Sequence, residues 1–224
     1  MDSNLRDAPL FTALDEQSAL ALRDSMTEFK IKKGDVLFQE DDLGDRLYLI
    51  TDGKIKLSHT SSDGRESLFT VLGPGEMFGE LSVFDPGPRT STAIAVTDAT
   101  VLGLAHDVLH SWLTQRPEVA QSLLQALANR LRRTSETMAD LVFADVPGRV
   151  AKVLLQLNEK FGKDAAIGRE VPHDLTQEEI AQLVGASRET VNKALADFVT
   201  RGWIRLETRA VHILDLERLQ GRAK

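Results

Sequence analysis

The periodicity of the sequence changes near Pro117, and this change limits the folds that the chain can adopt. Before it, short apolar runs are separated by turn residues, as at 52–53, 63–64 and 73–75. Such regular spacing predicts the short strands of a sandwich or barrel. After it, apolar residues recur every three or four positions, which predicts helices. The chain therefore joins a β-rich part to a helical part.

The β-rich part is expected to begin with a short helix over 11–25, capped by Asp15 or Thr12. Strands are expected to follow at 30–38, 46–50, 54–59, 66–72 and, as one or two strands, 93–104.

The composition excludes several classes of protein. With 224 residues and 42% hydrophobic composition, the chain can bury a sizeable core and divide in two. It contains no cysteine, which excludes disulfides, thiolate nucleophiles and cysteine-ligated metal sites. No apolar run approaches the roughly 20 residues of a membrane span, and the first residues do not resemble a signal peptide, so we expect a cytoplasmic protein with no membrane partner. The net charge is −9 over 1–115 and +2 over 116–224, which fits a regulatory module joined to a nucleic-acid module.

The helical part begins with an apolar seam of about three heptads. It could lie on the β-rich part of the same chain, but its length favours a coiled-coil dimer. Thr134 is a polar residue at a seam position, next to Ser135, and could either set the register or face a polar ligand. The seam residues are Ala120, Leu124, Leu127, Leu131, Thr134, Met138 and Leu141.

The stretch 78–93 gathers glycine turns, a carboxylate, one arginine and several hydroxyls within sixteen residues. Backbone N–H groups at glycine and a planar guanidinium suit a phosphate, while a carboxylate suits a ribose hydroxyl. A surface turn would explain Asp85-Pro86-Gly87-Pro88 equally well. From these residues alone, a sugar-phosphate site and a turn are both possible.

A helix-turn-helix motif follows a break at 142–149, where Asp145 can cap a helix with Pro147 in its first turn and Val150–Phe161 as its body. Thr176 and Glu179 form a capping box, Gly185 supplies the turn, and Ser187 caps the second helix. Polar side chains at the start of that second helix suit entry into a DNA major groove.

Side-chain chemistry then assigns DNA contacts. Arg188 can donate to guanine, Glu189 can accept from cytosine, and Lys193 can reach guanine or phosphate, with Asn192 beside them. A two-stranded hairpin, or wing, is expected over 202–214. Candidate phosphate contacts are Thr176, Ser187, Arg201, Arg205 and Arg209.

These motifs together resemble the cAMP receptor protein branch of the bacterial cAMP receptor/fumarate–nitrate regulator family, and most of all its actinobacterial cAMP-dependent members. The resemblance covers nearly the whole chain. The motifs that carry it are Phe78-Gly79-Glu80-Leu81, Arg89-Thr90, Arg133-Thr134-Ser135-Glu136, Asp145-Val146-Pro147-Gly148-Arg149 and 184–191.

The resemblance implies a role for each matching residue. Glu80 should hold the ribose 2′-hydroxyl of cAMP, with Gly79 and Leu81 lining the sugar, and Arg89 and Thr90 should bind the cyclic phosphate. Thr134 of one subunit and Ser135 of the other should meet the adenine. Arg188 and Glu189 should contact bases of a TGTGA-like half-site, where Lys193 replaces an arginine and relaxes discrimination. The pocket wall should comprise Leu57, Phe69, Thr70 and Leu72.

The expected fold is α+β: a cyclic-nucleotide-binding double-stranded β-helix (jelly-roll-like) over 1–115, a dimerisation helix over 116–144 and a winged helix-turn-helix over 145–224. The expected function is a homodimeric, cAMP-responsive transcription regulator with an operator DNA and RNA polymerase as partners and no metal. Three alternatives remain: the same fold with another effector or none, a metal-dependent barrel enzyme, and a regulatory subunit acting on a protein. Dispersed histidines disfavour the enzyme, and the wing disfavours the regulatory subunit.

Overall fold

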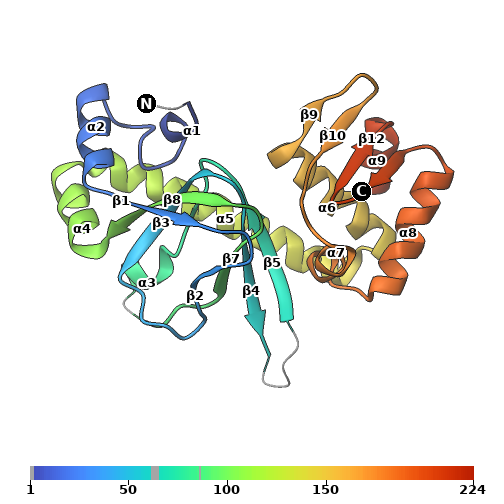
Figure 1. Ribbon diagram of the computed structural model, residues 1–224, viewed down its shortest axis with the longest axis horizontal. Helices are drawn as coiled ribbons and strands as arrows, with labels where there is room; N and C mark the ends of the chain where they lie inside the picture. The colour runs from blue at the N-terminus through green and yellow to red at the C-terminus, as the bar shows by residue number, and fades with distance from the viewer. Residues whose placement is uncertain (1–2, 62–65, 86) are drawn as a thin grey trace. The chain divides into compact units, whose positions relative to one another are not determined.

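The computed structural model describes residues 3–61, 66–85 and 87–224 (Figure 1). The chain forms two compact units, residues 1–65 with 69–133 and residues 134–224 with 66–68. The expected fold class is confirmed, because β-sheets are followed by a long helix and then by a helix-turn-helix with a wing. Each unit is described by itself.

Among the described residues, the strands of the first unit form two four-stranded sheets, ordered β1-β8-β3-β6 and β2-β7-β4-β5. Apolar side chains from both sheets share one core, which includes Ile50, Leu57 and Phe78. This is a β-roll. Its strands are β1 (Thr27–Ile31), β2 (Val36–Phe38), β3 (Arg46–Asp52), β4 (Ile55–Thr60), β5 (Glu66–Leu72), β6 (Met77–Phe78), β7 (Thr92–Ala95) and β8 (Ala99–Ala105).

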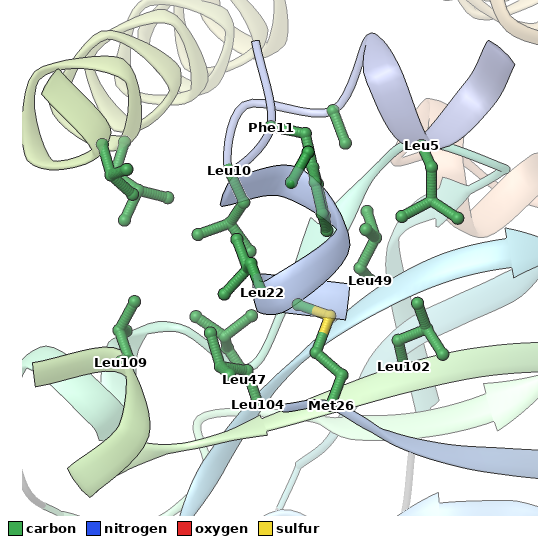
Figure 2. Packing of buried hydrophobic residues seen from close by; sticks show 14 of the residues in the cluster. Leu5, Leu10, Phe11, Leu22, Met26, Leu47, Leu49, Leu102, Leu104 and Leu109 are labelled. Atoms are coloured by element: carbon green, nitrogen blue, oxygen red, sulfur yellow. The ribbon is translucent and has the colours of Figure 1, made fainter. Parts of the chain in front are cut away.

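Strand β3 is apolar on both faces because both faces are covered. Tyr48 and Ile50 point into the core between the sheets, whereas Leu47 and Leu49 join a second core on the other face. Figure 2 shows that second core, where Leu22 and Met26 meet Leu47 and Leu104. The helices that supply the rest of it are α1 (Ser3–Arg6), α2 (Glu16–Asp24), α4 (His106–Gln115) and the start of α5 (Pro117–Phe143).

Two expected boundaries differ in the β-roll unit. The first helix was expected from residue 11, but α2 begins at Glu16, because Asp15 is its N-cap and accepts a hydrogen bond from the Ser18 N–H at 2.8 Å. Residues 8–14 form turns that place Phe11 in the core. The expected strand 30–38 is interrupted, since Gly34 has φ +88° and turns the chain between β1 and β2.

Helix α5 has 27 residues, which corresponds to about 40 Å at 1.5 Å per residue. Its first turns bury Val119 and Leu123, whereas Leu124 and Met138 on the apolar seam are 66% and 63% exposed. The seam is therefore distinct from the face that packs in the core of the β-roll unit.

The second unit contains a winged helix-turn-helix. Helix α6 begins at Val146 rather than Val150, because the Asp145 side chain caps its first turn and Pro147 needs no N–H partner there. The described strands of this unit form a small sheet with the order β11-β12-β10-β9. Strands β9 and β10 and the last helix, α9, were not expected from the sequence. The elements are α6 (Val146–Phe161), β9 (Lys163–Asp164), β10 (Arg169–Val171), α7 (Gln177–Val184), α8 (Arg188–Thr200), β11 (Ile204–Glu207), β12 (Ala210–Ile213) and α9 (Leu216–Arg222).

Candidate functional site: a polar pocket and a DNA-reading helix

A pocket opens beside the short helix α3 (Leu81–Phe84) of the β-roll. It combines one carboxylate, two guanidinium groups and several hydroxyls over a partly apolar floor. Such a mixture suits a polar ligand that carries an anionic group. The residues that line it are Phe38, Leu57, Gly79, Glu80, Leu81, Ser82, Arg89, Thr90, Ser91 and Arg130.

Glu80 is the acidic group of this pocket and is only 3% exposed. Its Oε1 accepts a hydrogen bond of 2.7 Å from Nη1 of Arg130 on α5, which compensates its charge. Its Oε2 is buried and has no hydrogen-bond partner in the structure. A buried carboxylate oxygen without a partner is costly, so this atom is ready to accept a hydrogen bond from a ligand hydroxyl.

Arg89 is the basic counterpart and is 4% exposed. Its Nη1 donates to the Gly79 carbonyl at 2.7 Å and its Nη2 to the Arg46 carbonyl at 2.8 Å, while its Nε is buried without a partner. Burial lowers the pKa of Arg89, although a guanidinium stays charged at neutral pH. Its two observed hydrogen bonds go to neutral carbonyls, so an anion would find both charge and a donor here.

Aromatic rings hold the guanidinium of Arg89 from one side. Its Cζ lies 4.3 Å from the centre of the Phe38 ring and 5.6 Å from that of Tyr48. These two rings stack at 5.8 Å, and Phe78 packs on Tyr48 at 5.4 Å. This stack supports a desolvated cation through its ring faces and limits the orientations of the guanidinium.

Glycine is required at two points around Arg89. A Cβ at Gly79, where φ is +75°, would lie 2.7 Å from Arg89 Nη1. A Cβ at Gly44 would lie 2.3 Å from the Cβ of Ser82. The backbone therefore approaches the arginine more closely than any other residue would allow.

The structure brings together six of the eleven expected pocket residues and finds four others. Phe38, Ser82, Ser91 and Arg130 were not expected. Arg130 lies four positions before Thr134, on one face of the same helix, and that spacing was the available signal. Phe69 is 58% exposed, and Leu72 belongs to the core of the β-roll. Thr134 and Ser135 lie on an exposed stretch of α5. The expected residues that line the pocket are Leu57, Gly79, Glu80, Leu81, Arg89 and Thr90, and those that are absent from its described lining are Phe69, Thr70, Leu72, Thr134 and Ser135.

The helix-turn-helix has the local structure that the sequence indicates. Thr176 and Glu179 form the expected capping box, Gly185 adopts a left-handed conformation with φ 68°, and the Ser187 side chain caps α8 by accepting from the Thr190 N–H. The hydroxyls of Thr176 and Ser187 thus serve as helix caps in this structure. Both remain exposed near helix N-termini, where a phosphate can approach.

Helix α8 presents its polar residues to solvent. Val191, Leu195 and Phe198 are buried against the domain, whereas Arg188, Glu189 and Lys193 are exposed. Nζ of Lys193 pairs with Glu189 Oε1 at 2.7 Å. Asn192 is half-buried, and its Oδ1 is buried without a partner. A helix exposed in this way can offer its first turns to a DNA groove.

Exposed arginines in the wing and just before it differ in their hydrogen-bond and ion-pair partners. Arg209 has φ 64° at the turn between β11 and β12, and its Nη1 donates to the Asp174 carbonyl at 2.9 Å. Arg205 pairs with Glu207 at 3.2 Å, and Arg201 pairs with Asp197 at 2.7 Å. The contact of Arg209 ties the wing to the segment that precedes α7.

The junction of α5 and α6 is joined to the helix-turn-helix by Arg149. Its Nη1 donates to the Ala144 carbonyl at 2.8 Å, its Nε to Val184 at 2.9 Å and its Nη2 to Gly185 at 3.3 Å. A Cβ on Gly185 would lie 2.8 Å from Leu141, so the end of α5 packs on the turn of the motif. Lys152 also pairs with Asp140 across the junction.

A polar pocket in a β-roll and a winged helix-turn-helix in one chain define a class: ligand-responsive DNA-binding regulators. Comparison with protein families supports both modules. Residues 28–116 match the cyclic nucleotide-binding domain, and residues 148–222 match the Crp-like helix-turn-helix domain.

Relatives identify the family. The chain is 53% identical over 224 residues to the CRP-like cAMP-activated global transcriptional regulator of Mycobacterium tuberculosis, with 100% of both chains covered. It is 34% identical to the cyclic AMP receptor protein of Thermus thermophilus, covering 96% of this chain and 97% of that one. The structure of FixK2 from Bradyrhizobium japonicum shares the fold, with a TM-score of 0.79 at 24% identity over 89% of this chain and 98% of that one. The chain belongs to the CRP-like family of transcriptional regulators, which confirms the expected family and a regulator rather than an enzyme.

Among the residues that the structure describes, no helix is both long and apolar enough to cross a membrane. Within the same residues, no group of three or more His, Cys, Asp or Glu side chains is arranged to hold a metal ion.

Proposed function

We propose that this chain is a homodimeric, cAMP-responsive regulator that binds a palindromic operator, and that cAMP re-aims its recognition helices. The observation that carries the proposal is the pair of buried, unpartnered atoms in one pocket, the Glu80 Oε2 acceptor and the Arg89 Nε donor. A ribose hydroxyl and a cyclic phosphate are complementary to these two atoms. The 53% identical relative from Mycobacterium tuberculosis is a cAMP-activated regulator by name, which supports cAMP as the nucleotide.

In this proposal different pocket residues bind different parts of the ligand. Arg89 and the Thr90 hydroxyl bind the phosphate, and Glu80 binds the ribose 2′-hydroxyl while Gly79 and Leu81 line the sugar. Arg130 fixes the orientation of Glu80, since it already pairs with its other oxygen. Thr134 of one subunit and Ser135 of the other meet the adenine edge. Leu57 supplies the apolar wall that the pocket already has, and Phe69, Thr70 and Leu72 on the adjacent strand β5 are assigned to an extension of that wall around the bound nucleotide.

The seam of α5 supports the dimer. Leu124, Leu131 and Met138 recur at intervals of seven and are each more than 60% exposed. An apolar seam with this period matches a second copy of the same helix in a coiled coil. The proposed domain organisation is then a nucleotide-binding domain over 1–115, a dimerisation helix over 116–144 and a DNA-binding domain over 145–224.

The dimer would present two copies of α8 to successive major grooves, about one helical turn apart. Arg188, Glu189 and Lys193 contact bases of a TGTGA-like half-site, with Asn192 beside them. RNA polymerase is the expected protein partner, and the cytoplasm, where the chromosome lies, is the expected location. The phosphate contacts are assigned to Thr176, Ser187 and Arg209.

Regulation requires that cAMP binds the DNA-competent conformation better than the other one. The adenine contact on α5 supplies the input, because the end of that helix is joined to the helix-turn-helix through Arg149 and Leu141. The hinge is placed at 143–147.

Isothermal titration calorimetry with cAMP and cGMP tests the pocket. Arg89→Ala is expected to weaken cAMP binding by about 100-fold or more, because a buried charge-assisted hydrogen bond contributes about 1.5–3 kcal/mol and the phosphate charge loses its counterion. Arg46→Ala is the matched control, since that guanidinium pairs with Asp45 and does not line the pocket.

Full cAMP affinity in a folded Arg89→Ala protein would reject the phosphate assignment. No heat with cAMP in the wild-type protein would reject cAMP as the effector and favour a regulator of this fold with another ligand or none.

A further inference from the structure

The last helix of the chain is attached to the hinge. Nη2 of Arg222, at the end of α9, donates to Oδ2 of Asp145 at 2.5 Å. The other oxygen of Asp145, Oδ1, accepts the Gly148 N–H at 2.9 Å and so caps α6. One carboxylate therefore serves the helix cap and the C-terminal helix together.

The packing around this pair leaves little space. A Cβ on Gly148 would lie 2.9 Å from Asp145 Oδ1, 3.2 Å from Arg222 Nη1 and 3.5 Å from the Arg222 carbonyl. Gly148 is buried, so the end of α9 rests on the backbone of the first turn of α6. Leu219, which is fully buried, holds α9 in the core of the domain. The position of Arg222 is thus set by the fold rather than by the ion pair alone.

Asp145 occupies the connection between α5 and α6, where movement of the dimer helix must pass to the DNA-binding domain. The preceding residue, Ala144, is also held from that domain, because its carbonyl accepts from Arg149. Phe143, the last residue of α5, is 86% exposed. Two guanidinium groups therefore fix residues 144 and 145 to the DNA-binding domain, in addition to the contacts of Asp140 and Leu141 at the end of α5.

We propose that Arg222 is a positioning residue for the allosteric switch: it braces the Asp145 cap, so that a movement of α5 turns the helix-turn-helix instead of being absorbed in a loosened connection. The brace rests on the proposed function, because it needs a cAMP response to transmit. It assigns a role to the C-terminal helix α9, which packs against α6.

The test compares the operator dissociation constant with and without saturating cAMP, and separately the cAMP affinity without DNA. Arg222→Ala is expected to reduce the cAMP-induced gain in operator affinity by about threefold or more, a typical effect of residues that carry coupling. Its cAMP affinity without DNA should stay unchanged. Arg222→Lys, which keeps the charge, should restore part of the gain.

Two further variants make the result specific. Asp145→Asn keeps an acceptor for the Gly148 N–H but loses the charge, so it should reproduce the effect of Arg222→Ala, and the double variant should be no worse than either. Arg218→Ala, an exposed arginine on the same helix, is the matched control and should behave as wild type.

The bracing role would be rejected if Arg222→Ala lowers the melting temperature but keeps the full cAMP-induced gain in operator affinity. The ion pair would then serve only the stability of the domain. Additive effects in the double variant would also overturn the bracing role. A wild-type protein without any cAMP response would reject the proposed function itself, and the brace with it.

Discussion

At the scale of single residues, Arg89 is a cation that the fold has desolvated before any ligand binds. Two carbonyls and the Phe38 ring fix its plane, while its Nε remains unpartnered. The cost of burying this charge is offset in part by the ring face and would be offset fully by an anion. In the proposed phosphate site, Phe38 therefore supports the arginine directly.

Replacing Phe38 tests this assignment. Phe38→Leu should weaken cAMP binding by about fivefold, because an arginine–aromatic contact in a desolvated site contributes about 1 kcal/mol. Phe38→Trp should retain most of the affinity, since it keeps a ring face. Calorimetry measures both, with thermal melting to verify folding.

Phe29→Leu is the control, because that ring faces Arg46 at 5.6 Å. An equal loss of cAMP affinity in this control would show that aromatic packing in general, and not support of Arg89, is responsible.

Single residues also show what sequence reasoning could reach. Glu80 and Arg89 were identified because their motif is local, with glycine, carboxylate and arginine in one short stretch. Arg130 and Phe38 were missed, because each meets its partner only across the fold: Arg130 is 50 positions from Glu80, and Phe38 contacts Arg89 from strand β2. Pairings of this kind depend on tertiary structure and leave little trace in spacing.

At the scale of elements, α5 has two apolar faces with different roles. Val119 and Leu123 are buried within the β-roll unit, whereas the seam that includes Leu124 and Met138 is exposed along the helix. A helix that only covered its own domain would need the first face alone. The proposed dimer would cover the second face with a partner helix.

Charges on the seam should abolish that pairing. The double variant Leu124→Glu and Met138→Glu is expected to convert the dimer to a monomer at micromolar concentration, because each seam would bury carboxylates without partners. Light scattering coupled to gel filtration measures the mass. Asn129→Glu, which lies on the opposite side of the helix, should remain a dimer.

A double variant that stays dimeric would show that the contact between copies lies elsewhere, and a wild-type monomer would remove the coiled coil from the proposal.

Local signals also decided which elements could be predicted. The capping box at Thr176, the left-handed Gly185 and the Ser187 cap were each predicted from a few neighbouring residues, and the structure contains all three. The Asp145 cap with Pro147 in the first turn of α6 was predicted in the same way, although the helix itself was expected only from Val150. Strands β9 and β10 were not predicted, because a strand of two or three residues is too short to show an alternating pattern of apolar and polar residues.

At the scale of the whole molecule, the chain combines a pocket that can sense a nucleotide with a domain that can bind DNA. In the proposal the two sites are thermodynamically coupled. The free energy by which cAMP strengthens operator binding must equal the free energy by which the operator strengthens cAMP binding. This reciprocity does not depend on the details of the hinge.

The most direct test is a linkage experiment on the wild-type protein, using fluorescence anisotropy with a palindromic TGTGA duplex and a scrambled duplex, with and without cAMP. We expect cAMP to strengthen binding to the palindrome by about 5- to 150-fold, the usual range of such couplings, and the palindrome to strengthen cAMP binding by the same factor. The scrambled duplex should show weak, salt-sensitive binding without this factor. If cAMP and the palindrome each bind but neither changes the affinity of the other, the chain is not a cAMP-responsive switch.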